Sequence, residues 1–324
     1  MIAFVTGGTG FIGSHLVEHL LASGQYSEVR CLVRTTDKWL EGMDFVRIKG
    51  DLNDPVALAK GLDGADTLFH LAAIVKAPTE KEFRIANVDA TEHLIRLAQR
   101  KGVVNQVILS SLAAAGPSNG TPLSEDEDMY PISLYGQSKK EMEIRIREIA
   151  GEMDSIKIIR PPAVYGPRED QIYQFFQTYA KGFCPIVGDG NHPRLSMVYV
   201  SDLVEGIYQA SLQTDAGVET YFMGGMEQYN WNQITGVTKI VMGKRALRIK
   251  LKPTLVKKVG ALVEGTASLF GKYPVVNKEK TNEMVMEWMC SNEKAQRKLN
   301  YNPGVSLQEG ISRTIHWYKQ YNWL

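Results

Sequence analysis

The chain has 324 residues, of which 44% are hydrophobic and 23% are charged, and its formal net charge is +1. This length allows one large domain with an added lobe or two domains, and the ordinary composition excludes disordered, collagen-like and disulfide-framework proteins. A net charge so close to zero provides no global field for nucleic acid, acidic lipid or another polyanion.

The cysteines and the N-terminus indicate the compartment. Cys31, Cys184 and Cys290 are odd in number and far apart, which predicts free thiols in a reducing environment. Met1 runs directly into an apolar stretch and a glycine turn, which leaves no room for a secretory signal, so we expect a cytoplasmic protein. No apolar run approaches the roughly 20 residues that cross a bilayer, and neither HExxH nor a Cys/His cluster occurs, so we expect no stable membrane insertion and no metal.

The first half of the chain alternates short runs rich in Val, Ile and Phe with longer segments of helical period. Such alternation is typical of βα units on a parallel sheet. Strands are predicted at 2–6, 28–33, 45–49, 67–70, 106–110 and 156–160, and helices at 11–23, 55–62 and 85–101.

After Arg160 the composition changes. Gly and Pro are frequent up to Pro193, which predicts a loop-rich insertion. A strand at 195–200 and a helix at 202–212 then suggest a return to the sheet, before a more helical stretch from about Asn230 onward. The expected fold class is α/β, a doubly wound parallel Rossmann sheet with a smaller, mostly helical C-terminal substrate lobe. The Rossmann domain is expected over 1–165, with 194–225 returning to it, and the lobe over 166–193 and 226–324.

A segment at 255–270 carries apolar residues at helical spacing beside Lys257 and Lys258. It is a candidate for a membrane-surface helix, a dimer helix or a helix that faces the core of the lobe, and stripes of this kind usually mean packing.

The glycine-rich turn at residues 7–13 follows the first predicted strand and opens the first predicted helix. Its glycines permit a tight turn and let backbone N–H groups and the helix N-terminus approach a pyrophosphate. Because the turn also starts a βα series, it predicts a dinucleotide site rather than a plain strand-to-helix connection.

Arg34 ends the second predicted strand, where an acidic residue would bond the ribose 2′-hydroxyl of NAD. A guanidinium matches the oxygens of a 2′-phosphate, and Lys38 follows four residues later. This favours NADP(H), with NAD(H) as the alternative cofactor; the other interpretation of Arg34 is a solvated arginine at a strand end.

Ser111 closes the fifth predicted strand, and Tyr135 and Lys139 stand four residues apart at the head of a charged helical segment. Residues i and i+4 share a helix face, so the ammonium is expected near the phenol, where it would lower the pKa of Tyr135 from about 10. Such a tyrosine can exchange the alcohol proton while hydride moves to or from a nicotinamide, and Ser111 can bond the same oxygen. Ser111, Tyr135 and Lys139 are therefore the predicted catalytic residues.

With these motifs the chain resembles the extended short-chain dehydrogenase/reductases of the NAD-dependent epimerase/dehydratase family over essentially its full length. The resemblance also lies in the motifs at 50–52, 70–73, 160–167 and 198–202. It implies that Asp51 and Leu52 bracket the adenine and that Leu71 to Ala73 line the dinucleotide. The full expected cofactor-binding set is Gly7, Gly10, Phe11, Ile12, Gly13, Arg34, Asp51, Leu52, Leu71, Ala72, Ala73, Tyr135, Lys139 and Pro161.

Two subgroups of that family share features with the chain. It is similar to nucleotide-sugar epimerases and dehydratases at Tyr135–Lys139 and at Arg194, whose counterpart grips a diphosphate, so Arg194 is a candidate substrate-binding residue. Those enzymes usually have Asn where this chain has Ala163, and they carry an Arg-x-Gly-Asp element that the chain lacks. The Val33-Arg34 pair and the segments 111–117 and 251–276 are more like the dihydroflavonol-reductase and 3β-hydroxysteroid-dehydrogenase branch.

The sequence therefore predicts an NAD(P)-dependent oxidoreductase that interconverts a secondary alcohol and a ketone of a bulky, apolar small molecule. The alternative is a nucleotide-sugar 4-epimerase with bound NAD. A 4,6-dehydratase ranks lowest because Leu112 and Ala113 supply no acid beside Ser111. The intact catalytic residues also disfavour a silent dinucleotide sensor. No nucleic-acid partner is expected, and the resemblance implies a homodimer through the helix that bears Tyr135.

Overall fold

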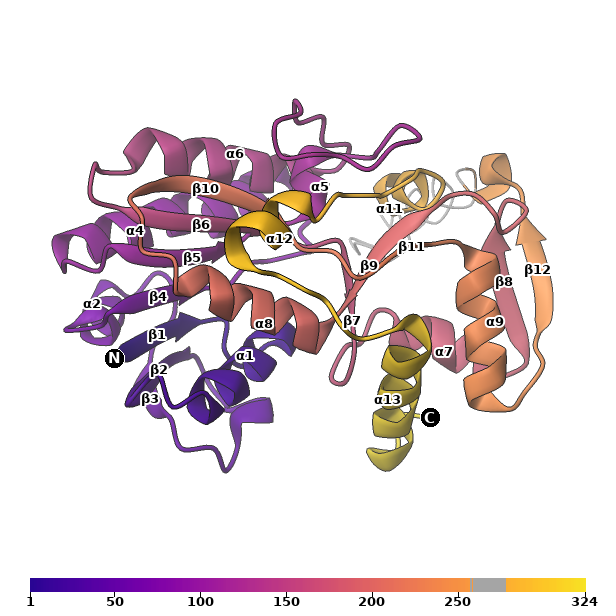
Figure 1. Cartoon of the computed structure of the whole chain (residues 1–324), viewed down its shortest axis with the longest axis horizontal. Helices are drawn as coiled ribbons and strands as arrows, with labels where there is room; N and C mark the ends of the chain where they lie inside the picture. Colours follow the sequence, from indigo (N-terminus) through magenta and orange to yellow (C-terminus); the bar gives the residue numbers. More distant parts are fainter. Residues whose placement is uncertain (257, 259–277) are drawn as a thin grey trace.

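The computed structural model describes residues 1–256, 258 and 278–324 (Figure 1). A sheet domain occupies one end of the molecule, and the lobe occupies the other. Most of the helix expected at 255–270 lies outside the described residues.

Seven parallel strands form the main sheet in the order β10-β6-β5-β4-β1-β2-β3. The order from β3 to β6 is that of a doubly wound Rossmann sheet, which reverses between β1 and β4 and opens a crevice at the carboxyl ends of these strands. The strands are β1 (Ile2–Thr6), β2 (Glu28–Val33), β3 (Val46–Lys49), β4 (Thr67–His70), β5 (Asn105–Leu109), β6 (Ser155–Arg160) and β10 (Gly217–Phe222).

Helices cover both faces of this sheet. Its strands are therefore buried on both sides and consist largely of apolar residues. Helices α1 (Phe11–Ala22) and α8 (Val200–Ser211) pack together on one face. The other face carries α2 (Pro55–Leu62), α4 (Ala90–Arg100) and α6 (Leu134–Ile149), with α3 (Glu80–Phe83) and the π-helical turn η2 (Arg84–Asp89) leading into α4. Adjacent side chains in β1 pack into the two hydrophobic cores on opposite faces of the sheet: Val5 lies under α1, and Phe4 lies under α2.

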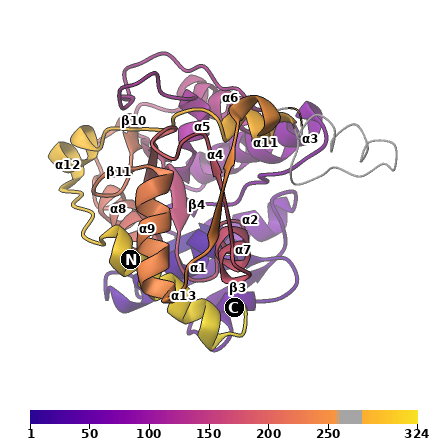
Figure 2. The same cartoon turned by 90° about the vertical axis from the view of Figure 1, so that its right-hand side faces the viewer.

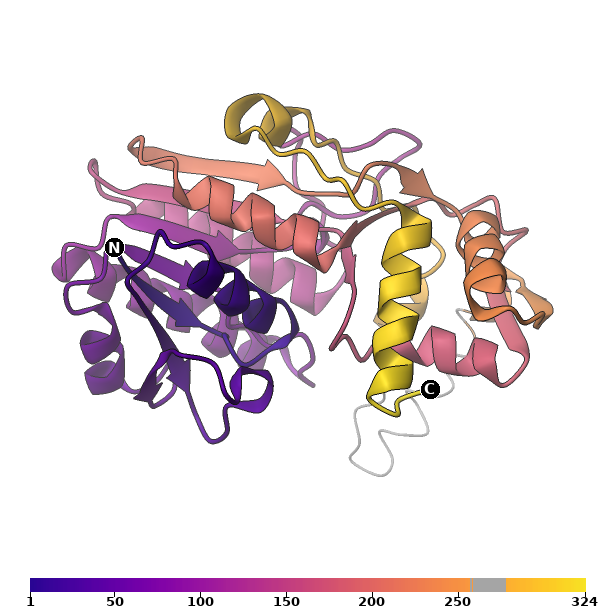
Figure 3. The same cartoon turned by 60° about the horizontal axis from the view of Figure 1, so that its bottom comes forward.

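The lobe is assembled from stretches of chain that are far apart in sequence. Its three-stranded sheet contains β7 (Ala163–Tyr165), β9 (Leu195–Tyr199) and β11 (Gln228–Tyr229), and a separate ribbon pairs β8 (Phe183–Val187) with β12 (Leu247–Leu251) in parallel. Its helices are α7 (Tyr173–Ala180), α9 (Trp231–Met242), α11 (Lys278–Glu283) and α13 (Leu307–Gln320), whereas α12 (Glu293–Leu299) packs against α8 and β10 of the sheet domain. Figures 2 and 3 show α9 and α13 side by side at this end of the molecule.

An aromatic core holds the lobe together. Tyr165 from β7, Phe176 from α7, Tyr199 from β9 and Tyr318 from α13 are all buried in one cluster. The rings of Tyr165 and Tyr199 meet edge to face at 5.4 Å, a favoured geometry for aromatic pairs. The last helix of the chain is therefore part of the core that shapes the lobe.

The predicted elements of the first half occur within one residue of their expected bounds, except that the start of the helix expected at 85–101 is π-helical. The strand expected at 195–200 is β9, which pairs with β7 and β11. The chain instead returns to the main sheet through α8 and β10, which pairs with β6.

The three cysteines are free, as predicted, and all three are buried. Within the described part of the chain, no helix is both long and apolar enough to cross a membrane. Among the same residues, no group of three or more His, Cys, Asp or Glu side chains is placed to hold a metal ion.

Candidate functional site

A cavity of about 770 Å³ opens at the carboxyl ends of the central strands and extends between the sheet domain and the lobe. Predicted site residues from distant parts of the sequence meet on its wall. They are Gly7, Gly10, Phe11, Ile12, Gly13, Leu71, Ala73, Ser111, Tyr135, Lys139 and Pro161.

The glycine turn forms one end of this cavity. Gly7 has a φ of +77°, and a Cβ there would lie 2.6 Å from the backbone nitrogen of Ala72, so Ala72 supports the turn from behind. A Cβ on Gly13 would overlap the carbonyl oxygen of Gly7. Helix α1 begins at Phe11 with no side-chain cap and no acidic residue in its first turn, which leaves its positive end free for an anion. This cradle fits the phosphates of a dinucleotide.

The other predicted cofactor residues lie at the same edge of the sheet but off the cavity wall. Arg34 follows β2, is exposed, and has no hydrogen-bond or ion-pair partner among the described residues. Asp51 follows β3, is exposed, and accepts a hydrogen bond from the backbone nitrogen of Asn53 at 2.7 Å. Leu52 packs against the core under α2.

The catalytic candidates stand at the starts of two helices. Ser111 caps the short helix α5 (Leu112–Ala115), accepting a hydrogen bond from the Ala113 nitrogen at 3.1 Å, and Ser133 caps α6 in the same way through Gly136. Tyr135 thus lies in the first turn of α6, with the Ser111 hydroxyl in hydrogen-bond contact with it. Burial raises the pKa of Tyr135 to about 12, because it outweighs the hydrogen bond from Ser111, and the charge of Glu283 raises the pKa further.

Lys139 lies one turn after Tyr135 and is 2% exposed. Its ammonium donates to the carbonyl oxygen of Leu109 at 2.7 Å, at the end of β5. Burial lowers the pKa of Lys139 to about 8, against the opposing effect of the Glu143 carboxylate. In this structure the pKa of Tyr135 therefore moves upward, opposite to the direction expected from the Tyr135–Lys139 spacing alone.

A buried ion pair supports these residues from below, and the sequence analysis missed it. Glu143, one turn after Lys139, accepts hydrogen bonds from the Arg160 guanidinium at 2.9 and 2.6 Å and from the Ser110 hydroxyl at 2.5 Å. Both Glu143 and Arg160 are almost fully buried. The network joins α6, β6 and the end of β5, which are the elements that present Lys139, Pro161 and Ser111. The i+4 spacing of Glu143 after Lys139 was the available signal.

His70, at the end of β4, is held neutral beneath the site. The Thr91 hydroxyl donates to the Asn87 carbonyl, so it accepts from His70 Nε2, and Nδ1 accepts from the Thr6 hydroxyl. Burial, with the nearby Lys139 charge, lowers the pKa of His70 to about 3.

Asn87 fastens the π-helical turn η2 to the site. Its side-chain amide exchanges two hydrogen bonds with the backbone of Ile74 and donates a third to the Ser138 hydroxyl at 3.0 Å. Asn87 is 1% exposed, which agrees with a packing role rather than a substrate contact.

The lobe side of the cavity is mostly apolar and aromatic. Its apolar residues include Phe83, Val164, Phe175, Phe176, Leu195, Met197, Trp231, Ile234, Met284 and Ile311. The charged residues on this side of the wall, within the described part of the chain, are four carboxylates and two lysines. They are Glu169, Asp170, Glu279, Glu283, Lys76 and Lys280. No arginine lines the cavity within residues 1–256, 258 and 278–324, and Arg194 lies off the wall.

Helix α11 brings the lobe directly to Tyr135. The carboxylate of Glu279 accepts a hydrogen bond at 3.2 Å from the backbone nitrogen of Leu134, the residue before Tyr135. Glu283 lies one turn further along α11 on the same face, close enough for its charge to act on Tyr135. The sequence analysis missed these two carboxylates, because only the tertiary contact between α11 and α6 places them in the site.

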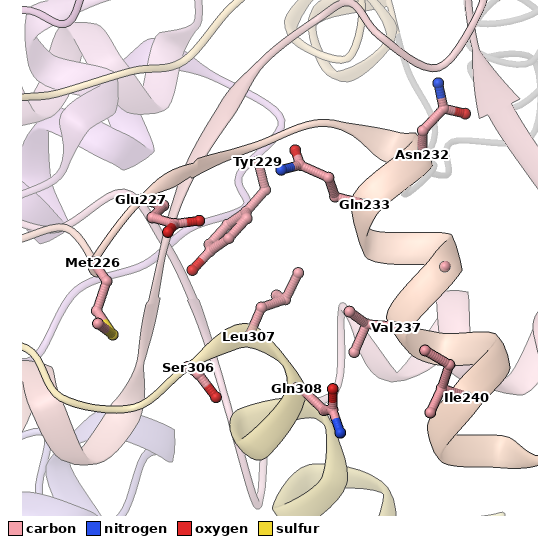
Figure 4. Close-up of a pocket in the computed structure, with 11 residues that line it drawn as sticks. Met226, Glu227, Tyr229, Asn232, Gln233, Val237, Ile240, Ser306, Leu307 and Gln308 are labelled. Atoms are coloured by element: carbon pink, nitrogen blue, oxygen red, sulfur yellow. The ribbon is translucent and has the colours of Figure 1, made fainter.

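A second pocket, of about 440 Å³, lies on the side of α9 that faces away from the main cavity (Figure 4). Asn232, Gln233 and Val237 of α9 and Leu307 of α13 line it, whereas Trp231 and Ile234 line the main cavity. Its wall contains no predicted site residue, so the chemistry belongs to the main cavity.

Comparisons with known proteins agree with this geometry. Residues 3–224 match the model of the NAD dependent epimerase/dehydratase family. A ceramide reductase of Caulobacter vibrioides is 27% identical, with 100% of this chain and 96% of that protein covered. The 3 beta-hydroxysteroid dehydrogenase/Delta 5→4-isomerase of Mycobacterium tuberculosis is 25% identical, with coverages of 97% and 89%.

Solved structures show the same similarity. A mutant UDP-glucuronic acid 4-epimerase of Bacillus cereus, in complex with UDP-4-deoxy-4-fluoro-glucuronic acid and NAD, is 25% identical. It matches with a TM-score of 0.78, covering 99% of this chain and 100% of that one.

Proposed function

The chain belongs to the NAD-dependent epimerase/dehydratase family, an NAD-dependent enzyme family within the extended short-chain dehydrogenase/reductases, and from this premise we propose its reaction. The enzyme interconverts a secondary alcohol and a ketone on a bulky, predominantly apolar small molecule. In this proposal the sheet domain, which the sequence predicts over 1–165 and 194–225, binds the dinucleotide, and the lobe, which includes β7 and β9, binds the substrate.

One observation carries the choice of substrate class. On the lobe side of Tyr135 the cavity wall is apolar and aromatic. Its charged groups there are mainly carboxylates, and no arginine lines this wall within the described part of the chain. A diphosphate needs cationic, preferably bidentate, donors and is repelled by Glu279 and Glu283. The wall therefore favours an apolar ketone over a nucleotide sugar, and the similarity to a ceramide reductase and a steroid dehydrogenase supports the same class.

The residues divide the chemistry as follows. The bound nicotinamide cofactor supplies or accepts the hydride at the substrate carbon. Ser111 donates a hydrogen bond to the substrate oxygen and holds it beside Tyr135. With its pKa raised, Tyr135 is protonated at neutral pH, so in the direction of reduction it gives its proton to that oxygen. The Lys139 ammonium then stabilises the phenolate that remains.

We also propose that NADP(H) is the preferred cofactor. The supporting observation is the exposed guanidinium of Arg34 at the end of β2, which has no partner among the described residues and is available to a 2′-phosphate. Solved relatives bind NAD, so preference for NADP(H) would distinguish this chain from them.

The second candidate is a nucleotide-sugar 4-epimerase with bound NAD. The similarity to a UDP-glucuronic acid 4-epimerase favours it, because Ser111, Tyr135 and Lys139 would serve either reaction. The two candidates differ in the part of the substrate that does not react.

The test compares the two substrate classes on one preparation of enzyme. We expect oxidation of NADPH with a 3-ketoceramide or a 3-ketosteroid, followed by absorbance, and no heat of binding with UDP-glucose or UDP-glucuronic acid by calorimetry. Tight UDP-sugar binding together with no turnover of either ketone would refute the proposed reductase. Tyr135→Phe is the negative control for turnover.

A further inference from the structure

The ribbon of β8 and β12 presents an apolar face to solvent at the end of the molecule farthest from the sheet domain (Figure 1). Paired residues share a face, and Leu247 pairs with Phe183 while Ile249 pairs with Pro185. All four are exposed, Leu247 at 66% and Phe183 at 50%. Soluble proteins rarely leave a contiguous apolar face of this kind uncovered without a use.

The opposite face of β8 is an ordinary buried face. Cys184 and Ile186 are almost fully buried against Tyr179, Phe175 and Trp231. The ribbon is thus anchored on one side, and its exposed face is not the product of a loose or unpacked strand.

Cations flank the ends of this apolar face. Lys181 lies two residues before Phe183, Arg245 lies two residues before Leu247, and Lys252 follows β12, and all three side chains are exposed. Lys250 pairs with Ile186 and therefore lies on the opposite face of the ribbon. Between Glu227 and Glu264 the sequence contains eight Lys or Arg residues and no Asp or Glu. This local excess of positive charge stands out in a chain whose net charge is +1.

We propose that this ribbon docks the enzyme onto an anionic lipid bilayer surface. Exposed apolar side chains that enter the headgroup region, surrounded by Lys and Arg that attract anionic lipids, are the two components of reversible binding to a membrane surface. A second copy of the chain would bring like charges together on this face, and nucleic acid would leave the apolar side chains without a partner. The bilayer satisfies both components at once.

The position of the ribbon gives docking a use. Phe175 and Trp231, against which the buried side of β8 packs, also line the main cavity. The docking face is therefore separated from the cavity by the ribbon, its buried side chains and the rings of Phe175 and Trp231, so docking would hold the cavity side of the lobe toward the bilayer. The proposal concerns the surface alone and does not depend on which substrate the cavity accepts.

Vesicle sedimentation tests the proposal on the full chain. The protein is mixed with vesicles of phosphatidylcholine alone, or of phosphatidylcholine and phosphatidylglycerol in equal parts, at low and high salt. We expect binding to the anionic vesicles that weakens as salt screens the charges. Each exposed cation near a bilayer contributes about fivefold to partition, so K181Q/R245Q is expected to bind about 25-fold more weakly.

The matched control is K60Q/R100Q, which removes the same charge from exposed positions on α2 and α4. It is expected to bind like the wild type. L247S/I249S keeps every cation and tests the apolar component, with an expected loss of about tenfold or more. Unchanged unfolding temperature and dinucleotide binding in all three variants show that the fold is intact.

Three results would overturn the proposal. One is no sedimentation with the anionic vesicles at low salt. Another is equal binding by K181Q/R245Q and K60Q/R100Q. The last is tighter binding to a DNA duplex than to the anionic vesicles, which would assign the cations to nucleic acid.

Discussion

The carboxylate of Glu143 and the guanidinium of Arg160 form a bidentate pair inside the protein, directly below the helix turn that carries Lys139. Removing one partner of a buried pair leaves the other charge without compensation and costs about 3–5 kcal/mol. We expect Glu143→Gln to lower the free energy of unfolding in urea by about this amount. Glu148→Gln, which breaks an exposed pair with Arg145 on the same helix, is expected to cost less than about 1 kcal/mol. Equal losses of unfolding free energy in the two variants would show that the buried pair stabilises the fold no more than the exposed pair.

Tyr135→Phe removes the proposed proton donor while keeping the ring that meets Phe83 at 6.2 Å. We expect kcat to fall by about 10²–10⁴-fold, with dinucleotide binding within about twofold of the wild type, since acid–base catalysis by one side chain is worth that much. Tyr130→Phe, at an exposed tyrosine outside the cavity wall, is the control and is expected to leave kcat unchanged. Retention of wild-type turnover by Tyr135→Phe would remove Tyr135 from the mechanism.

Arg34→Ser tests the cofactor preference. Hydrogen bonds to a charged group contribute about 1.5–3 kcal/mol, so NADPH is expected to bind at least about tenfold more weakly to the variant, with NADH unaffected. The measurement is the stabilisation against thermal unfolding by each dinucleotide, which follows from its Kd and concentration. Arg100→Ser is the control. If wild type and Arg34→Ser respond alike to NADPH, Arg34 is a solvated arginine.

Gly13→Ala inserts a methyl group where the carbonyl oxygen of Gly7 stands, so the glycine turn must shift. We expect loss of dinucleotide binding and a lower unfolding temperature. Gly236→Ala is the matched control, because Gly236 lies within α9 with open space around it and alanine is the better helix former by about 1 kcal/mol. Dinucleotide binding by Gly13→Ala at wild-type affinity would contradict the steric argument.

His70 predicts a dependence of stability on pH. Its pKa falls from 6.5 to about 3 on folding, so between these values the unfolded chain binds a proton that the folded protein does not. Stability contributed by neutral His70 is therefore present above about pH 6.5 and is lost progressively as the pH falls toward about 3. Between pH 7 and pH 5 we expect the wild type to lose about 2 kcal/mol more than His70→Gln in urea unfolding.

The control for this series is His93→Gln, an exposed histidine on α4, which is expected to keep the wild-type slope. Identical slopes for the wild type and His70→Gln would mean that His70 does not stay neutral in the folded protein.

The first half of the fold could be predicted because its signals are local. Buried parallel strands are continuous apolar runs, and the glycine turn marks the end of β1 and the start of α1. The local sequence from Ile2 onward therefore predicts these elements. The placement of Tyr135 and Lys139 on one helix could be predicted for the same reason, since their spacing of four residues is a local pattern. Their environment could not, because the Glu283 charge that acts on Tyr135 comes from α11, which is far away in the sequence.

The lobe side of the site could not be predicted, because its contacts join distant segments. Glu279 meets Leu134 across 145 positions of sequence, and nothing in either local pattern records that contact. Arg160 belongs to a recognised motif but ends a strand, so its burial beside Glu143 was not visible. Exposed apolar residues in β12 alternate with cations and look like a solvated strand until β8 is known to be its partner.

The place of α13 in the lobe core determines when the enzyme can become competent during its synthesis. Tyr165, Phe176 and Tyr199 all precede residue 200, yet they share their buried cluster with Ile311, Ile315 and Tyr318 at the end of the chain. The glycine turn, α6 and most of the main sheet are complete long before α13 leaves the ribosome. Most of the sheet domain can therefore form early, whereas the aromatic cluster of the lobe waits until α13 has been translated.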